Sequence, residues 1–463
     1  MGRFSLKSFF LVQRDWLTLL AISSLTIFSK TYNIDKRVGL SWDHARDAEV
    51  IWRIVVERKL TLIGPQVVSD NAFFLGPLWY YLNLPFYLFT GLDPIAGSLG
   101  VMTFALFTLI AVYFFVKNLA GRTAAIIASL IWAGLPDIIP WNPILVPFFV
   151  ISILYFVFKS LDGDKKSLIY TSLVVGLALQ IHFQMIFFVP LLSLLFISFA
   201  VLYRSIPVLT ILLSLSVLLL TFLPQIIFDL RHEFLNLFGL LKLFGLSAGE
   251  RVRETLYLTQ LSSVIPKFTT SHFFLASLPV PGYLIGSALI VLSVIGNLLL
   301  KISKFKKLVL ILITFAPVFF FSLYKGNLSE YYFYICSVPI LIGFSNLLKV
   351  IFNFSIIGKT LVSLLLLTII ISNLDIVLKE KNEMSLKDQK AVVRYLKNQK
   401  EDEKLNVSFT LPYNYDAGFK YLFKYYNLSV DDVPEAHLWT IYIPKQEIMG
   451  LRFVSGDIGL VRK

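Results

Sequence analysis

Long apolar runs separated by short charged stretches dominate the sequence. Runs close to the roughly 20 residues that span a bilayer begin near Trp16, Pro94, Thr123, Pro143, Leu168, Phe183, Pro207, Gly282, Leu308, Tyr331 and Gly358. The stretch from Leu168 to Leu202 is 35 residues long and carries no Asp, Glu, Lys or Arg. At about 1.5 Å per residue it is too long for one crossing, and the polar segment "LQIHFQ" divides it. The pattern therefore predicts eleven transmembrane helices.

Basic residues indicate which side of the membrane each loop faces. With a cytoplasmic N-terminus, the short inner loops hold twelve Lys and Arg residues and the short outer loops hold only Lys325, in agreement with the positive-inside rule. Treating the apolar segment from Leu75 to Phe89 as a twelfth span would place the basic loop "KISKFKK" outside. We therefore expect this segment, which contains Pro77 and Pro85, to lie in the outer interface or dip into it.

Three stretches face the outside in this topology: about 31–93, about 229–281, and the chain from about Lys379 onward. In the last, the residue patterns predict helices over 384–399 and 417–427 and strands over 405–411, 439–444 and 457–461. We therefore expect an all-α polytopic membrane domain over 1–378, with interfacial helices in its first outer loop. A small extracytoplasmic α/β domain is expected over 379–463.

Composition agrees with an integral membrane protein. The chain is 57% hydrophobic and only 15% charged, with a mean hydropathy of +0.75, which is typical of multi-pass membrane proteins. The net charge of +13 is explained by basic cytoplasmic loops, so we expect no nucleic-acid partner. Cys336 is the single cysteine, which excludes an intrachain disulfide. The basic N-terminal stretch lacks a small-residue cleavage site and is expected to be a retained helix.

The charged stretch "SWDHARDAEVI", Ser41–Ile51, follows the first apolar run. Apolar residues after it recur at helical spacing, which predicts an amphipathic helix on the membrane surface; they are Ala48, Ile51, Trp52 and Val55. Asp43 and Asp47 are four residues apart and share a flank of that helix. From spacing alone, a solvated helix start in which Asp43 pairs with Arg46 explains the stretch better than a functional site does.

Further polar segments fall at the outer ends of predicted spans. They are "WNP" at Trp141–Pro143, "LQIHFQ" at Leu179–Gln184, "FLPQIIFDLRHEFLN" at Phe222–Asn236 and "SEYYFYI" at Ser329–Ile335. The inner loops carry mostly lysine. This asymmetry predicts a functional cavity at the outer leaflet.

In this order, the segments resemble those of integral-membrane glycosyltransferases of the GT-C fold. The sequence is most similar to bacterial relatives of protein O-mannosyltransferases and to the lipid A aminoarabinose transferase. The resemblance covers roughly Trp16–Val377 and rests on the acidic motif at Asp43, on "GPLWYYL", and on "WNP", "LQIHF" and "FDLRHEF". Relatives commonly have Asp-Glu where this chain has Asp43 and His44, which leaves the acceptor type open.

The resemblance implies transfer of a sugar, with inversion, from a polyprenyl-phosphate carrier to an acceptor hydroxyl on a protein, lipid or glycan. A carboxylate would act as general base, for which we choose Asp43, with Asp47 positioning the reactants. Arg231 is the first choice for the lipid phosphate, although it is equally explained as an interfacial arginine paired with an acid. The remaining candidates for substrate binding are Arg46, His44, Tyr80, Tyr81, Asn142, His182, His232 and Tyr331.

No cofactor or metal is expected, and His182 is explained more simply as a packing residue. Two other classes of function stay open: a flippase or transporter of lipid-linked glycans, and a non-catalytic assembly protein. The transferase hypothesis requires Asp43 and Arg231 to face one cavity near the outer leaflet.

Overall fold

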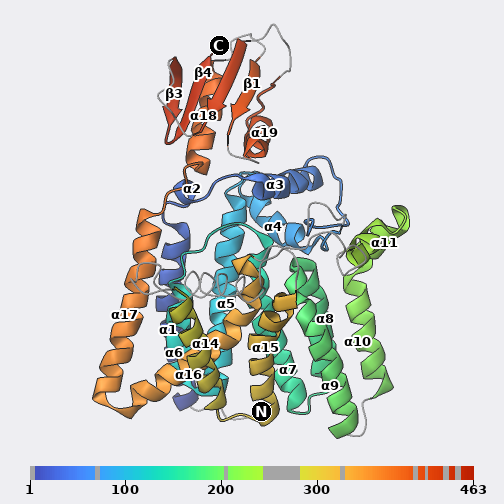
Figure 1. The fold of residues 1–463 in the computed structure, drawn as a ribbon, viewed down its shortest axis with the longest axis vertical. Helices are drawn as coiled ribbons and strands as arrows, with labels where there is room; N and C mark the ends of the chain where they lie inside the picture. Colours follow the sequence, from blue (N-terminus) through green and yellow to red (C-terminus); the bar gives the residue numbers. More distant parts are fainter. Residues whose placement is uncertain are drawn as a thin grey trace.

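The computed structural model describes residues 6–67, 73–202, 207–242, 282–323, 329–399, 405–411, 415–430, 437–443 and 450–462. It shows a bundle of upright helices with a small mixed sheet at one end (Figure 1). Arg204, Lys325 and the greater part of the second outer loop, 243–281, lie outside the described residues.

The upright helices belong to the apolar runs of the sequence. They are α1 (Leu6–Thr31), α5 (Ala96–Ala120), α6 (Arg122–Ala133), α7 (Val146–Leu161), α8 (Lys166–Ile181), α9 (Phe188–Leu202), α10 (Val208–Thr221), α14 (Gly282–Leu298), α15 (Lys304–Leu323), α16 (Tyr334–Phe354) and α17 (Ile356–Lys379). Short helices join or cover them: α2 (Ile34–Arg37), α3 (Trp42–Val55), α4 (Leu78–Phe89), η1 (Asn142–Leu145), η2 (Phe183–Phe187), α11 (Leu223–Arg231), α12 (Leu235–Leu241) and η4 (Glu330–Phe333).

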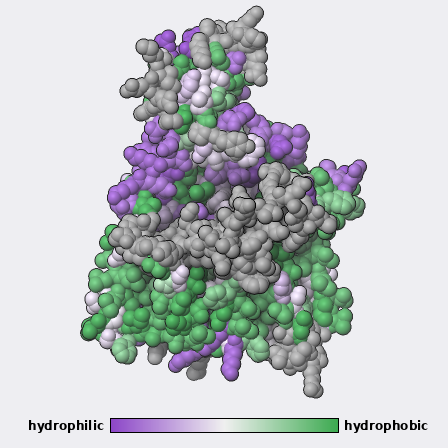
Figure 2. Space-filling view, in the orientation of Figure 1, coloured by the Kyte–Doolittle hydropathy of each residue, from purple (hydrophilic) through white to green (hydrophobic). Residues whose placement is uncertain are grey.

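Among the described residues, four helical stretches are long and apolar enough to cross a membrane: 96–120, 142–161, 330–354 and 356–379. The pair α10 and α11, bent by 55°, makes a fifth if it counts as one span. The predicted count of eleven is therefore not confirmed, although the stretch 168–202 is divided where expected. Figure 2 shows hydrophobic residues around the sides of the bundle and hydrophilic residues above them, below the C-terminal sheet.

Helices α3 and α4 lie across the upper end of the bundle (Figure 1). Helix α4 has 12 residues, too few to cross a bilayer, as expected for the segment from Leu75 to Phe89. Helix α3 buries Ala48 and Ile51 of the predicted stripe. However, α4 and α19 (Asp416–Tyr425) pack against α3, so this stripe contacts protein where we expected it to contact lipid.

The C-terminal region forms the predicted α/β unit. It contains α18 (Leu386–Asn398), α19 and a four-stranded sheet in the order β1-β2-β4-β3. The strands are β1 (Leu405–Thr410), β2 (His437–Tyr442), β3 (Leu451–Ser455) and β4 (Ile458–Arg462). Strand β1 pairs in parallel with β2, and β4 pairs antiparallel with β2 and β3. We did not predict β3, although Gly456, with φ +58°, provides the hairpin turn that joins it to β4.

Candidate active site

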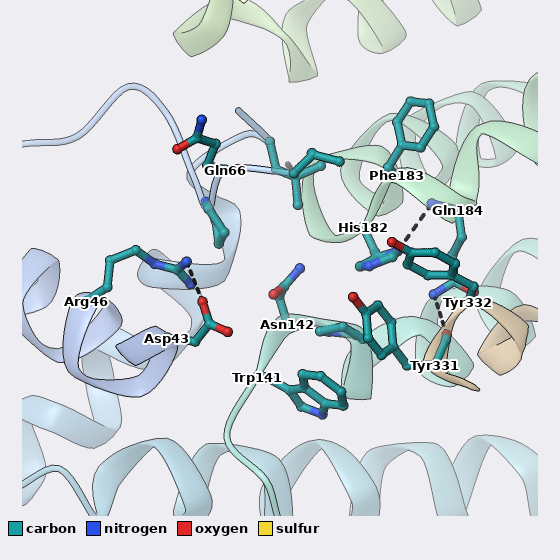
Figure 3. A pocket seen from close by; sticks show the side chains of 14 residues that line it. Asp43, Arg46, Gln66, Trp141, Asn142, His182, Phe183, Gln184, Tyr331 and Tyr332 are labelled. Carbon is teal, nitrogen blue, oxygen red and sulfur yellow. Dashed lines mark hydrogen bonds and ion pairs between the residues drawn. The ribbon is translucent and has the colours of Figure 1, made fainter. Parts of the chain in front are cut away.

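A cavity of about 280 Å³ opens at the upper end of the bundle, beside α3. Its walls come from five places far apart in the sequence, which are the start of α3, the loop after α3, η1, the turn after α8, and η4 (Figure 3). The lining residues are Asp43, Arg46, Pro65, Gln66, Val67, Leu75, Trp141, Asn142, Pro143, His182, Phe183, Gln184, Tyr331 and Tyr332. The fold therefore gathers four of the polar segments that the sequence places at the outer face.

One wall of the cavity carries a chain of hydrogen bonds that ends at Asp43. Trp79 Nε1 donates to Asp47 Oδ2 at 2.6 Å, and Asp47 Oδ1 accepts from Arg46 Nε and Nη2 at 2.9 and 2.7 Å. Arg46 Nη1 then donates to Asp43 Oδ1 at 2.7 Å. The Asp43 side chain is 55% exposed and that of Asp47 only 6%. Asp43 therefore reaches the cavity, whereas Asp47 lies behind it and fixes Arg46.

Electrostatics around Arg46 fix its role. Burial raises the pKa of Asp47 against the opposing effects of Arg46 and Trp79. Burial also lowers the pKa of Arg46, but its two carboxylate partners outweigh that effect and raise it. The guanidinium is therefore a permanent cation whose donors are already shared between two acids. It is poorly suited to binding the lipid phosphate, and well suited to orienting Asp43.

His182 forms part of the opposite wall, in the turn between α8 and η2. Burial lowers its pKa to about 3, so the ring is neutral at ordinary pH. Its Nδ1 accepts from Gln184 N at 3.2 Å, which places the ring proton on Nε2. The imidazole meets the ring of Tyr331 edge-on with a centroid distance of 5.6 Å. His182 therefore presents a neutral N–H donor beside aromatic surface.

Asn142 and Tyr331 complete this wall. Asn142 Nδ2 donates to Ile181 O at 2.6 Å, which leaves its amide oxygen as an acceptor in the cavity. Tyr331 packs edge-on against Trp141 at 4.7 Å, and its carbonyl accepts from Gln184 Nε2 at 3.1 Å. A mostly aromatic wall with a few oriented polar groups is the usual lining of a small-molecule site.

Three predicted site residues lie near this cavity without lining it. His44 Nδ1 contacts Gly39 O at 2.9 Å, and its ring lines a separate small cavity with Asp47 and Trp79; burial lowers its pKa. Tyr80 is 2% exposed, and burial raises its pKa. Tyr81 donates from its hydroxyl to Thr61 O at 2.8 Å. These three side chains are therefore held by contacts outside the cavity lining.

Arg231 and His232 lie at the end of α11, outside the cavity lining. The His232 ring stacks on Phe228 at 4.1 Å, while Arg231 is exposed. The expectation that Asp43 and Arg231 line one cavity is therefore not met among the described residues. Helix α11 is bent by 55° relative to α10, so Arg231 does not continue the line of that span.

Other polar residues of the Phe222–Asn236 stretch hold a neighbouring loop. Asp229 Oδ1 accepts from Asn236 N at 2.7 Å, at the start of α12. Asn236 Oδ1 in turn accepts from Phe74 N at 2.6 Å, and Gln225 Nε2 donates to Phe74 O at 3.2 Å. Residue 74 precedes Leu75, which lines the cavity. Helices α11 and α12 therefore hold the loop that forms part of the cavity wall.

Several cavity and support residues were not among the predicted site residues, and three of them show why. Trp79 lies inside the quoted "GPLWYYL" motif, where we chose the two tyrosines, and nothing in the local pattern reveals that its indole reaches Asp47. Tyr332 neighbours the predicted Tyr331. Gln66 is a single polar residue in a loop, brought to the cavity by its bridge to Phe74. Within the described residues, no group of three or more His, Cys, Asp or Glu side chains is arranged to hold a metal ion.

Comparison with known proteins gives a result at the level of fold. No family model and no curated protein sequence matches this chain. The structure is similar to ArnT from Cupriavidus metallidurans bound to undecaprenyl phosphate, with a TM-score of 0.60, 12% identity and 98% of each chain covered. It is also similar to the apo state of that protein, with a TM-score of 0.59, 12% identity, and 97% and 98% of the two chains covered.

A third structure, the Archaeoglobus fulgidus oligosaccharyltransferase in complex with Zn and sulfate, matches with a TM-score of 0.48 and 14% identity. The match covers 90% of this chain and 58% of that one. The chain is thus a helical membrane protein with the fold of ArnT. The resemblance that the sequence predicts is confirmed at the level of fold by the two ArnT structures.

Proposed function

We propose that this protein is an integral-membrane glycosyltransferase that moves a sugar from a polyprenyl-phosphate carrier to an acceptor hydroxyl at the outer face of the membrane. One observation carries the proposal: the cavity bordered by Asp43 lies at the end of an apolar bundle whose fold matches ArnT over 98% of both chains. That ArnT structure holds undecaprenyl phosphate. The donor we propose here is a carrier of this kind with a sugar linked to its phosphate.

Asp43 is the proposed general base. Its Oδ1 is held by Arg46 at 2.7 Å, and its side chain points into the cavity (Figure 3). As the acceptor oxygen bonds to the anomeric carbon, the bond from that carbon to the phosphate oxygen breaks, and the acceptor proton passes to Asp43. The lipid phosphate leaves with the bonding electron pair, and attack from the opposite side inverts the configuration. A base within hydrogen-bond reach of the attacking hydroxyl is the requirement for this step.

The opposite wall would bind the sugar. His182 Nε2–H serves as a donor, the Asn142 amide oxygen as an acceptor, and Tyr331 as a flat apolar surface. Asp47 and Trp79 act through Arg46 and do not touch the substrate. This division agrees with the burial of Asp47, whose side chain is 6% exposed.

Arg231 stays our proposed ligand of the carrier phosphate, which would then lie beside the cavity and outside its lining. It is exposed at the end of α11, and α11 packs against the loop that carries Leu75. Among the described side chains, none forms an ion pair with Arg231. A guanidinium offers two parallel donors to a phosphate, and stabilising the departing charge is often the largest catalytic effect.

The proposed arrangement in the cell membrane has eleven spans, a cytoplasmic N-terminus, a catalytic domain over 1–378 and an extracytoplasmic domain over 379–463. Twelve basic residues in the short inner loops against one in the short outer loops support it. The sugar is a hexose or pentose, and the acceptor is a protein, lipid or glycan.

The test uses purified protein in lipid nanodiscs with a panel of polyprenyl-phosphate hexoses and pentoses, each offered to peptide, lipid and glycan acceptors. We expect one donor to yield a glycosylated product together with free polyprenyl phosphate in equal amount, and Asp43→Asn to abolish both. Product that forms equally with Asp43→Asn overturns the role of Asp43. Movement of intact carrier across vesicles, with no donor cleaved, identifies a flippase and overturns the proposal.

A further inference from the structure

The segment leading into α3 is held by the C-terminal unit. Gln389 of α18, which is fully buried at 0% exposure, forms a reciprocal pair of hydrogen bonds with the backbone of Leu40. Its Oε1 accepts from Leu40 N at 2.9 Å, and its Nε2 donates to Leu40 O at 3.3 Å. Leu40 lies two residues before the start of α3 at Trp42. Gln389 therefore fixes the chain immediately before the helix that carries Asp43.

Backbone contacts extend this attachment. Leu386 N donates to Val38 O at 2.7 Å and Asn382 N to Lys36 O at 3.0 Å, and Gly39 forms an antiparallel bridge with Ser385. Residues 36–40 and 382–389 thus run side by side. Hydrogen bonds buried between two segments resist local opening.

Helix α19 contacts α3 itself. Gly418 lies so close to Leu40 that a Cβ atom added there would be 1.9 Å from Leu40 O. Further along, Lys424 Nζ donates to Glu49 Oε1 at 2.8 Å and lies 5.1 Å above the Trp52 ring. Asp43 faces the cavity, whereas Glu49 and Trp52 of the same helix face α19.

The first turn of α3 is held from within by the contact of Ser41 Oγ with His44 Nδ1 at 3.2 Å and by the Arg46–Asp43 pair, but it lacks a backbone cap. Ser41 occupies the N-cap position but makes no side-chain capping hydrogen bond, a bond that typically contributes about 1 kcal/mol. Asp43 lies in that first turn. Its position therefore depends on the backbone that Gln389 holds and on the contacts from α19.

We propose that the C-terminal unit is a positioning element for Asp43, with Gln389, Gly418 and Lys424 as positioning residues that act through Leu40 and Glu49. The catalytic part of this inference rests on the proposed function. The ordering of α3 by the C-terminal unit does not depend on the proposed function, so either statement can be wrong while the other holds. None of the three residues touches the cavity lining.

The test uses the full-length protein in nanodiscs and compares Gly418→Ala, Glu49→Lys, Lys424→Glu and the double exchange Glu49→Lys with Lys424→Glu. Lys420→Ala is the control, because Lys420 pairs with Asp416 within α19 and is exposed. Amide hydrogen–deuterium exchange over 42–55 reports the order of α3, and kcat and KM for the carrier report catalysis.

We expect exchange over 42–55 to become about tenfold faster in Gly418→Ala and about threefold faster in each charge variant, the scale of one or two weakened contacts. The double exchange should recover part of this loss, because it restores the Glu49–Lys424 pair with reversed charges but not the contacts of Lys424 with Glu57 and Trp52. Turnover should fall in parallel while KM for the carrier holds, because only the geometry of the base changes. Lys420→Ala should match wild type in every measurement.

Unchanged exchange over 42–55 in all three single variants overturns the inference. Faster exchange with undiminished kcat overturns the positioning of Asp43. Should Gly418→Ala fail to fold, the charge variants and their double exchange still decide the matter. If the wild-type protein transfers no sugar, the proposed function fails, and the exchange measurement alone decides whether the C-terminal unit orders α3.

Discussion

Trp79 holds Asp47 from the side opposite Arg46, through a 2.6 Å hydrogen bond from Nε1 to Oδ2. This buried carboxylate therefore accepts hydrogen bonds at both of its oxygens, and the position of Arg46 depends on it. Because Arg46 in turn holds Asp43, the indole of Trp79 in α4 helps to fix the position of the Asp43 carboxylate, which faces the cavity.

Trp79→Phe should remove the donor while keeping most of the ring volume. Asp47 would be left with an unsatisfied oxygen in a buried site, so the free energy of unfolding should fall by about 1–3 kcal/mol. Turnover should fall as well, because Arg46 loses its fixed partner. Trp132→Phe is the matched control: Trp132 Nε1 donates to Ala105 O at 3.1 Å, away from the cavity lining, so it should lower stability without this loss of turnover. Equal turnover in the two variants would show that Trp79 has only a packing role.

Asp43→Asn should lower mainly turnover, whereas Asp47→Asn should lower mainly stability. Asp43→Asn removes the proton acceptor, so turnover should fall roughly 10²–10⁴-fold, with stability little changed because the side chain is 55% exposed. In Asp47→Asn one oxygen becomes an NH₂ group that faces Arg46 or Trp79, so we expect a stability loss of about 1–3 kcal/mol and a smaller loss of turnover. Thermal unfolding and single-turnover kinetics separate the two effects. A larger turnover loss in Asp47→Asn would reverse the roles.

His182 should make stability depend on pH. Its pKa is lowered to about 3 in the folded protein against about 6.5 in the unfolded chain. As pH falls below about 6.5, the unfolded chain binds the proton first, so the stabilisation present above that pH is lost progressively toward pH 3. Between pH 7.5 and 5.5 the wild type should lose roughly 1 kcal/mol more than His182→Gln, measured by denaturant unfolding. A His182→Gln profile identical to wild type would contradict the neutral ring.

Arg231→Ala should raise KM for the lipid donor about tenfold or more, the scale of one charge-assisted contact. Arg231→Lys should recover only part of this loss, because a single ammonium cannot reproduce two parallel donors. Folding should be unaffected because the side chain is exposed. Donor titrations at fixed acceptor measure the effect. An unchanged KM in both variants would leave Arg231 as an interfacial residue and place the phosphate elsewhere.

The proposed topology can be tested with two engineered thiols. Cys336 is buried, so an impermeant maleimide should report only introduced cysteines. Lys420→Cys in α19 should react on intact cells, and Lys301→Cys, in the basic loop after α14, only after the membrane is opened. Labelling in the opposite order would invert the topology.

The sequence predicts the parts of this structure that depend on local pattern. Long apolar runs give the helices, the polar break at His182 divides 168–202 as expected, and the i,i+3 spacing predicts the pair between Asp43 and Arg46. The meeting of Asp43, Asn142, His182 and Tyr331 in one cavity follows from placing their segments on one side of the membrane.

The features that the sequence did not predict depend on contacts between distant segments, which the local residue pattern does not encode. Trp79 reaches Asp47 across two helices, and the bend before α11 takes Arg231 away from the cavity lining. His44 was chosen because it stands at an acidic position of the resembling family, but its helix turns it toward Gly39. The predicted count of eleven spans is not confirmed, because several described apolar helices are shorter than the runs that predicted them.

Leu40 and Gln389 are 349 residues apart, so the hydrogen bonds between them have a consequence for biosynthesis. Leu40 belongs to the first polar segment to emerge from the ribosome after α1, and Gln389 is made only after α17. During this interval the bundle is inserted helix by helix while the backbone before Asp43 still lacks its partner. A nascent or prematurely terminated chain that ends between Tyr332 and Gln389 would thus contain every residue that lines the cavity and yet lack the contacts by which we propose that the C-terminal unit orders α3.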